Sequence, residues 1–223
     1  MLEVAEGIQH LHTEGIVHGD LHGVRGSILN FLFVSSCHHH QGNVLLDSEY
    51  HCKITDFGLT RHCEATIAAS TRTFCPNFAA PELFGMCPIC GEPECNDNHD
   101  VQHRNKTMET DVYAFGCLYY AVRFKCHLVY SRYWALTVQI FFGIVPFHDK
   151  TELQIVRLFN DGKRSDRLES PEMADETWNL IQSCWKSKPS ERPTMDEIVT
   201  NYGNPGEVVF IGWDFAMLVL AIL

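Results

Sequence analysis

The chain has 223 residues, of which 45% are hydrophobic and 20% are charged, and its formal net charge is −11 at pH 7. A chain of this length and composition can bury a hydrophobic core, which excludes a protein that is disordered throughout. The acidic balance also disfavours a nucleic-acid-binding surface, because such a surface requires clustered positive charge.

Neither a secretory signal nor a membrane span is apparent. The longest apolar stretch, residues 208–223, contains Asp214 and is shorter than the roughly 20 residues that cross a bilayer. Without a signal, the 10 cysteines are better interpreted as thiols or metal ligands than as disulfides. We therefore expect a cytoplasmic, intracellular protein with no membrane partner. The sequence does not indicate its oligomeric state.

The hydrophobic pattern predicts a mainly helical α+β domain. Residues 1–14 are expected to form an amphipathic helix, because Leu2, Ala5 and Ile8 recur three apart and share one face. Residues 43–47 and 52–55 are strand candidates around a polar turn, and together they predict a short β-hairpin. The chain turns apolar and helical from position 111. Later helices are expected to begin near positions 151, 171 and 193.

Three short motifs follow one another in the chain and are more specific together than any of them alone. They are His-Gly-Asp at residues 18–20 followed by Asn43, Asp-Phe-Gly at residues 56–58, and Ala-Pro-Glu at residues 80–82. Asp-Val-Tyr-Ala-Phe-Gly at residues 111–116 and Arg-Pro at residues 192–193 add two further matches. Over residues 1–202, this set resembles the C-terminal lobe of a eukaryotic protein kinase of the tyrosine-kinase-like group.

The resemblance implies ATP-dependent transfer of phosphate to hydroxyl groups of a protein substrate, with Ser/Thr and Tyr specificity both open. Such transfer depends on positioning and on neutralisation of charge more than on covalent help. In family terms, Asp20 is the catalytic base, and Asn43 and Asp56 are catalytic residues that bind two Mg²⁺ ions. The cofactor ATP would also contact Leu45, which forms the floor of the adenine pocket.

Family resemblance also assigns structural roles. Asp111 is expected to brace the backbone of the loop that contains the base, and Glu82 is expected to pair with Arg192. Two positions depart from the usual pattern. Gly19 stands where many kinases have arginine, so regulation through an activation-loop phosphate is not expected. His22 stands where Ser/Thr kinases usually have lysine.

A complete kinase also needs a glycine-rich loop, and a strand lysine paired with a helix glutamate, before its catalytic loop. No Gly-x-Gly occurs in this chain, and its first lysine is Lys53. The expectation is therefore a C-lobe without an N-lobe, whose ATP site is incomplete and whose activity is impaired. The alternative is a catalytically inactive fragment or pseudokinase that acts as a binding module.

Two segments, residues 24–41 and residues 122–139, interrupt the family pattern. Both begin with Val-Arg and end with Gln, and removal of the first restores the family spacing between Asp20 and Asn43. Because valine codons begin with GT and one glutamine codon is CAG, the segments have the ends of unspliced introns translated in frame. Genuine loop insertions are the alternative. Residues 203–223 are interpreted as a tail with the same candidate origin.

Translation of the two segments would have structural consequences. We expect the first segment to push Asp20 and Asn43 apart, which would separate the base from the metal ligand. The second would place Arg123, Lys125 and Arg132 in a helix that the family buries, where unpaired charge costs several kcal/mol. The predicted result is a broken helix and a destabilised lobe.

A Cys/His-rich loop at residues 87–103 predicts a structural zinc site. Its candidate ligands are Cys87, Cys90, Cys95, His99 and His103. Cys-x-x-Cys is the spacing at which two thiolates reach one tetrahedral Zn²⁺, and a third cysteine with one histidine completes four ligands. The alternative is a long loop that carries reduced thiols.

Overall fold

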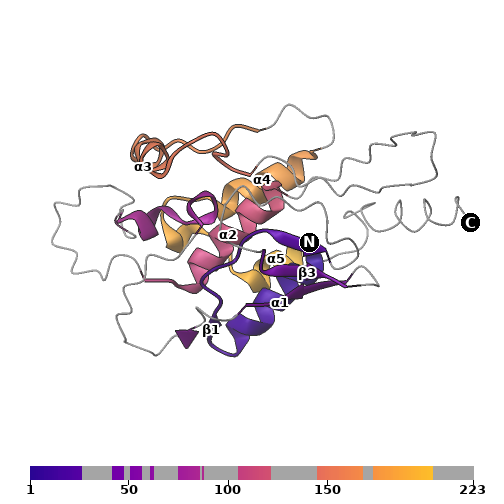
Figure 1. Cartoon of the computed structure of the whole chain (residues 1–223). Coiled ribbons are helices and arrows are strands. Elements are labelled where there is room, and N and C mark those ends of the chain that lie inside the picture. Colours follow the sequence, from indigo (N-terminus) through magenta and orange to yellow (C-terminus); the bar gives the residue numbers. More distant parts are fainter. Residues whose placement is uncertain are drawn as a thin grey trace, which may run out of the picture.

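The structure of the protein is a computed structural model that describes residues 1–26, 42–47, 51–56, 61–62, 75–85, 87, 105–121, 145–167 and 173–202. Helices dominate these residues (Figure 1). The α-helices are α1 (Leu2–Thr13), α2 (Met108–Ala121), α3 (Glu152–Asn160), α4 (Asp175–Cys184) and α5 (Met195–Tyr202). Three short 3₁₀ helices are η2 (Pro76–Phe78), η3 (Pro81–Phe84) and η4 (Pro189–Glu191). Within the described ranges, none of the helices has the length and apolar character of a membrane span.

Among the described residues, short strands form two small sheets. They are β1 (Ile16–Val17), β2 (Val24–Gly26), β3 (Val44–Leu46), β4 (Cys52–Ile54) and β5 (Arg61–His62). β3 runs antiparallel to β4, with Val44 opposite Ile54, while β2 runs parallel to β3 on its other side. β1 pairs antiparallel with β5. The predicted hairpin is therefore confirmed as β3–β4, whereas the pairing of β2 is not predicted by the sequence pattern.

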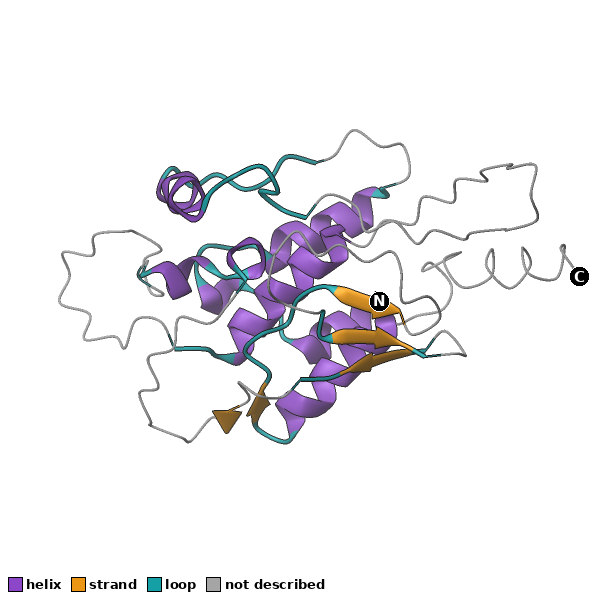
Figure 2. Ribbon diagram, viewed as in Figure 1, coloured by secondary structure: helices purple, strands orange, loops and turns teal. Residues whose placement is uncertain are grey.

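Helix α2 lies at the centre of the hydrophobic core, and every residue from Thr110 to Leu118 is buried. α4 packs against α2, and α5 packs against α1 (Figure 2). Gly116 allows the close approach of α4, because a Cβ atom at this position would lie only 2.6 Å from Cβ of Cys184. Any side chain at residue 116 would therefore push the two helices apart.

The predicted amphipathic helix at the N-terminus is confirmed as α1, with Val4 and Ile8 fully buried. Glu3 fastens this helix to the hairpin. Its carboxylate accepts a hydrogen bond from the backbone N–H of Cys52 at 2.7 Å and lies 2.6 Å from Nδ1 of His51. As a result, the strands that carry part of the site are held against the first helix.

Helix α3 begins with a capping box. The backbone N–H of Gln154 donates to the hydroxyl of Thr151, and the Gln154 side chain accepts from the backbone N–H of Thr151 at 2.8 Å. Both interactions satisfy backbone donors that the first turn of a helix leaves unpaired. This confirms the predicted helix start near position 151.

The other predicted helix boundaries are confirmed to within a few residues. α2 begins at Met108, slightly before position 111, and α5 begins at Met195, two residues after the predicted proline. α4 begins at Asp175 rather than near position 171. α2 ends at Ala121, directly before the segment 122–139. That segment and the tail 203–223 lie outside the described residues.

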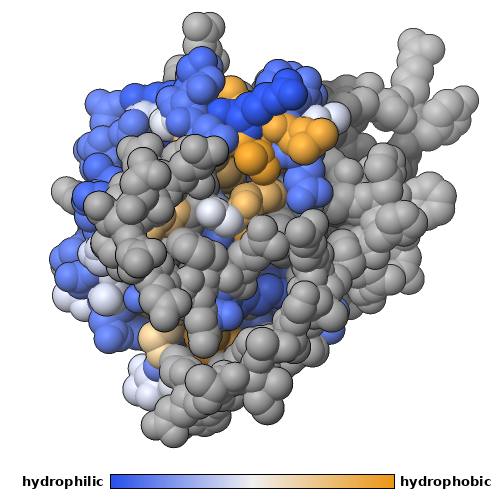
Figure 3. Space-filling model, turned by 90° about the vertical axis from the view of Figure 1, so that its left-hand side faces the viewer, coloured by the Kyte–Doolittle hydropathy of each residue, from blue (hydrophilic) through white to orange (hydrophobic). Residues whose placement is uncertain are grey.

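One face of the protein is seen in Figure 3, where most of the described surface is hydrophilic and hydrophobic side chains gather in one small area. Leu153 of α3 is a large hydrophobic residue that is 73% exposed. Isolated apolar residues of this kind are ordinary on protein surfaces. The polar surface agrees with the strongly acidic composition.

Candidate active site

The loop of residues 18–23, called the catalytic loop below, follows β1 and is anchored by His18. The ring of His18 is completely buried, and its Nδ1 accepts the backbone N–H of Asp20 at 3.2 Å. Its Nε2 therefore carries the proton that is donated to the carbonyl oxygen of Thr55, 3.1 Å away. The tautomer is assigned from these partners. His18 thus joins the catalytic loop to the chain segment that leads into Asp56.

Asp111 of α2 holds the backbone of the catalytic loop from the opposite side. Its Oδ2 accepts the backbone N–H of His18 and its Oδ1 accepts that of Gly19, both at 2.8 Å. Asp111 is only 1% exposed, and hydrogen bonds to a carboxylate contribute about 1.5–3 kcal/mol each. The bracing role expected for Asp111 is confirmed.

A second histidine contacts the same carboxylate. Nε2 of His12, near the end of α1, lies 3.1 Å from Oδ2 of Asp111. The sequence pattern assigns no role to His12, because nothing local indicates a partner that lies 99 positions away. Asp111 therefore ties α1, α2 and the catalytic loop together.

Asn43 lies directly beside Asp20. Its Nδ2 donates to the carbonyl oxygen of Asp20 at 2.6 Å, and its backbone N–H donates to the carbonyl oxygen of His22 at 2.9 Å. The backbone N–H of Thr55 in turn donates to the carbonyl oxygen of Asn43 at 2.8 Å. Asn43 is 1% exposed. These bonds hold the predicted base and the predicted metal ligand in a fixed position relative to each other.

The expectation that residues 24–41 separate Asp20 from Asn43 is therefore wrong. The chain leaves the catalytic loop at Gly23 and returns at Gly42, and these two backbones touch. A Cβ atom on Gly23 would lie 3.0 Å from Cα of Gly42, and Gly23 has a φ of +53°, which favours glycine. Because the segment leaves and re-enters the site at neighbouring points, it does not increase the distance in space between Asp20 and Asn43.

Asp56 and Leu45 lie on the hairpin side of the site. Asp56 follows β4, is exposed, and adopts a φ of +67°, a left-handed conformation that is uncommon for residues other than glycine. Such backbone strain clusters at functional sites. Leu45 lies in the middle of β3, opposite Lys53 of β4. Phe57 and Gly58, which complete the motif after Asp56, lie outside the described residues.

The predicted ion pair between Glu82 and Arg192 is confirmed and is buried. Nη1 and Nη2 of Arg192 lie 2.7 and 2.8 Å from the two carboxylate oxygens of Glu82. The guanidinium also donates to the carbonyl oxygens of Lys186 and Glu109, and it stacks over the ring of Tyr113. The ion pair thereby holds the Ala-Pro-Glu segment against the chain that follows η4.

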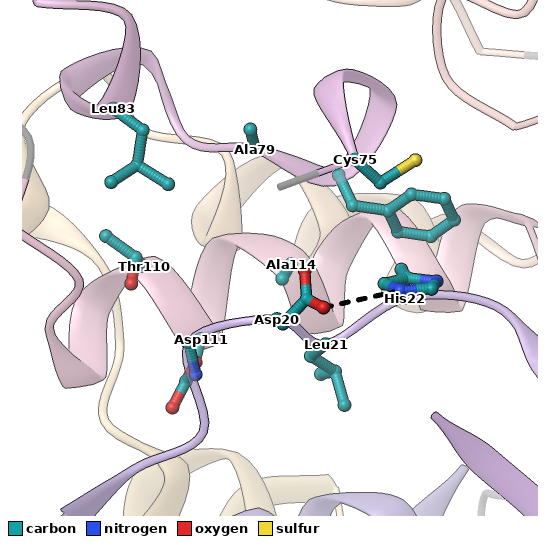
Figure 4. Close-up of a pocket in the computed structure, with 11 residues that line it drawn as sticks. Asp20, Leu21, His22, Cys75, Ala79, Leu83, Thr110, Asp111 and Ala114 are labelled. Atoms are coloured by element: carbon teal, nitrogen blue, oxygen red, sulfur yellow. Dashed lines mark hydrogen bonds and ion pairs between the residues drawn. The ribbon is translucent and has the colours of Figure 1, made fainter. Parts of the chain in front are cut away.

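A pocket lies beside Asp20, between the catalytic loop, residues 75–83 and α2 (Figure 4). Phe78 lines one wall, and Ala114 of α2 lines another. His22 lies in the same pocket, with its Nε2 3.6 Å from Oδ2 of Asp20. The sequence identifies His22 only as a departure from the family pattern, and its proximity to the base is apparent only in the structure.

Two buried cysteines near the centre of the domain are chemically inert. Burial raises the pKa of the Cys117 thiol far above its ordinary range and raises the pKa of Cys184 to about 12. Both thiols are therefore protonated at neutral pH and act as packing groups rather than as nucleophiles. The polar side chains of Asp20, His22 and Asn43 beside the catalytic loop are instead carboxylate, imidazole and amide groups.

The zinc prediction is largely outside the described residues. Of its candidate ligands, Cys87 is described and is buried. Cys90, Cys95, His99 and His103 lie outside the described ranges. Among residues that the structure describes, no group of three or more His, Cys, Asp or Glu side chains could hold a metal ion. The zinc site stays a prediction.

Comparison with known proteins agrees with this geometry. The sequence model of the protein kinase domain matches residues 27–202. A dual serine/threonine and tyrosine protein kinase of Apis mellifera is 30% identical over 201 residues, which cover 89% of this chain and 16% of that protein. Kinase suppressor of Ras A of Caenorhabditis elegans is 26% identical over 202 residues, which cover 88% of this chain and 21% of that protein.

This chain spans about a fifth or less of the length of these curated relatives. The family match extends from before Asn43 to the end of α5, and so it includes Asp56, Glu82, Asp111 and Arg192. Because it covers well over half of the chain, and because the braced loop and the buried ion pair have the arrangement that the motifs imply, the chain belongs to the protein kinase family.

Proposed function

We propose that this domain transfers the terminal phosphate of ATP to hydroxyl groups of protein substrates, with Asp20 as the base. One observation carries the proposal. Nδ2 of Asn43 is 2.6 Å from the carbonyl oxygen of Asp20, although the two residues are 23 positions apart. Phosphoryl transfer depends on holding the base and the metal ligand in fixed relation, and these contacts would provide that relation.

The donor set of the site suits Mg²⁺. Asn43 and Asp56 offer amide and carboxylate oxygens, which are the ligands that hard cations prefer. Because Nδ2 of Asn43 donates to the carbonyl of Asp20, the amide oxygen is the atom that can bind a cation. When bound, Mg²⁺ and ATP supply the phosphate to be transferred and neutralise its charge.

Asp20 itself would accept the proton of the substrate hydroxyl. Its backbone N–H is held by His18 and its carbonyl oxygen by Asn43, so the Cα–Cβ bond points in a fixed direction. The carboxylate lines the pocket beside the catalytic loop. A carboxylate that is positioned in this way can act as a general base. A serine, threonine or tyrosine side chain in the pocket is the proposed acceptor.

The 223 residues on their own are proposed to transfer phosphate poorly or not at all. They contain no Gly-x-Gly and no lysine before Lys53, so they supply no phosphate-binding loop of the usual kind. The same observation favours a second candidate function, in which the domain binds a protein partner without phosphoryl transfer. An intracellular location belongs to the proposal, because ATP is an intracellular metabolite.

The test starts from the transcript. Sequencing across codons 20–43 and 118–144, and upstream of Met1, shows whether the segments are retained and whether the reading frame is longer. Protein made from that reading frame is then assayed for transfer of labelled phosphate to Ser, Thr and Tyr peptides. We expect Asp20→Asn to lower kcat by about 100-fold or more.

Asp149→Asn is the matched control, because this exposed carboxylate pairs with Lys150 outside the site. Equal activity of the wild type and Asp20→Asn would contradict the proposed base. If folded wild-type protein transfers no phosphate and Mg-ATP does not raise its melting temperature, the binding function is favoured instead. For the 223-residue chain alone, we expect no such rise in melting temperature.

A further inference from the structure

A histidine stands next to the proposed base on the same loop. Nε2 of His22 lies 3.6 Å from Oδ2 of Asp20, as the dashed line in Figure 4 marks. This separation is longer than that of a hydrogen bond. The His22 side chain is 3% exposed and that of Asp20 is 15% exposed. The contact is therefore shielded from water, which strengthens the interaction between the two groups.

Contacts of both its ring and its backbone place His22 in the pocket. Its ring packs against the ring of Phe78, with centroids 6.2 Å apart and planes inclined by 55°. The backbone carbonyl of His22 accepts the N–H of Asn43 at 2.9 Å. Phe78 belongs to η2, shortly before the Ala-Pro-Glu segment. His22 thus bridges the catalytic loop and the segment that forms the opposite wall.

We propose that His22 is a positioning residue for Asp20, on the condition that Asp20 is the base proposed above. His18 and Asn43 already hold the backbone of Asp20, so the rotation of its carboxylate is the degree of freedom that a side-chain contact must fix. Nε2 of His22 faces Oδ2, so the other carboxylate oxygen is the one that would accept the substrate proton. A contact of 3.6 Å without substrate can shorten when the substrate binds.

The first test measures the NMR signals of the His22 imidazole directly in the full chain. Protein labelled with ¹⁵N-histidine gives long-range ¹H–¹⁵N signals for each imidazole nitrogen, and the His22 signals are assigned by their loss in His22→Gln. We expect Asp20→Asn to shift the Nε2 signal of His22, whereas the exposed control Asp149→Asn leaves it in place. An Nε2 signal that is the same in the wild type and Asp20→Asn overturns the proposal.

The second test separates positioning from packing. His22→Phe retains a ring against Phe78 but removes Nε2, whereas His22→Gln retains a nitrogen donor. In protein labelled with ¹³C-aspartate, the carboxyl signal of Asp20 should move in His22→Phe and stay closer to its wild-type position in His22→Gln. An unchanged Asp20 signal in a folded His22→Phe variant would make His22 a packing residue only.

The two tests also separate this inference from the proposed function. They need no phosphoryl transfer, so a response of His22 to Asp20→Asn in a protein without activity would support the contact of His22 with the Asp20 carboxylate and contradict the proposed function. In protein that does transfer phosphate, His22→Phe should lower kcat by about 10-fold or more at unchanged KM for ATP. Partial recovery of kcat in His22→Gln would agree with positioning, while equal kcat in all three proteins would contradict it.

Discussion

Deletion of residues 24–41 should leave the fold and the proposed site intact. The deletion joins Gly23 to Gly42, and a Cβ atom on Gly23 would lie only 3.0 Å from Cα of Gly42. Consecutive Cα atoms are about 3.8 Å apart, so the new peptide bond requires only a small local adjustment. Neither Asn43 nor Asp20 is deleted, so the hydrogen bond from Asn43 Nδ2 to the carbonyl oxygen of Asp20 should remain.

Two opposing terms determine the change in the free energy of unfolding. Closing a loop of about 18 residues costs roughly 2.5 kcal/mol in chain entropy, and the deletion removes this cost. The deletion also removes β2, which pairs with β3 from Val24 to Gly26. Loss of two or three backbone hydrogen bonds, at about 1 kcal/mol net each, costs roughly 2–3 kcal/mol. The terms nearly cancel, so Tm should change by less than about 4 °C.

The assay is thermal and urea unfolding followed by circular dichroism, for the wild type and for the protein without residues 24–41. A matched control removes residues 27–44, which is the same length of chain but includes the buried Asn43 and Val44. We expect the control to lose several kcal/mol or to fail to fold. If deletion of residues 24–41 abolishes cooperative unfolding, the geometric argument is refuted. The same result would favour a genuine insertion that the fold requires.

Three further predictions concern other parts of the chain. Glu82→Gln leaves Arg192 buried without its charge partner, so urea unfolding should show a loss of about 3 kcal/mol; an unchanged midpoint would contradict the role of the pair. Burial raises the pKa of Glu3, but the hydrogen bonds from Cys52 and His51 together lower it by more, so the net pKa is below its ordinary value. Its carboxylate is 42% exposed, so Glu3→Gln should lower the free energy of unfolding by less than about 1 kcal/mol at pH 7. This difference from the wild type should disappear as the pH falls below about 4.5, because the wild-type carboxylate is then protonated. A difference that grows in acid would contradict the role of Glu3. Purified protein should contain stoichiometric zinc that Cys90→Ser loses, and metal analysis that finds none in the wild type excludes the site.

The local elements could be predicted from the sequence because their signals are local. The three-residue spacing of Leu2, Ala5 and Ile8 predicts α1, and the hairpin follows from two apolar runs around a polar turn. The motifs also predict the contacts of Asp111 and Arg192, although only through family resemblance. The start of α4 is predicted less well, because a proline marks the region of a helix start and not its first residue.

Contacts between distant parts of the chain could not be predicted. No local pattern indicates that His12 reaches Asp111, that β2 pairs with β3, or that the ring of His22 packs on Phe78. The predicted separation of Asp20 from Asn43 is wrong because the two ends of the intervening segment, Gly23 and Gly42, lie next to each other in space. The entropy of closing a loop grows only slowly with its length, so the hydrogen bonds of Asn43 can outweigh it.

The site tolerates the insertion of residues 24–41 because hydrogen bonds between separate elements hold it together. It does not depend on an uninterrupted catalytic loop. Asp111 fixes the first two residues of the loop from α2, and His18 fixes the loop to Thr55. Asn43 then fixes Asp20 from the start of β3. None of these bonds involves residues 24–41, and those from Asn43 to Asp20 and from His18 to Thr55 join the chain on either side of the insertion, so an insertion after Gly23 leaves each of them available. An insertion between His18 and Asp20 would instead break the hydrogen bond from the Asp20 N–H to the His18 ring, which joins residues two positions apart. The proposed base would then lose its fixed direction.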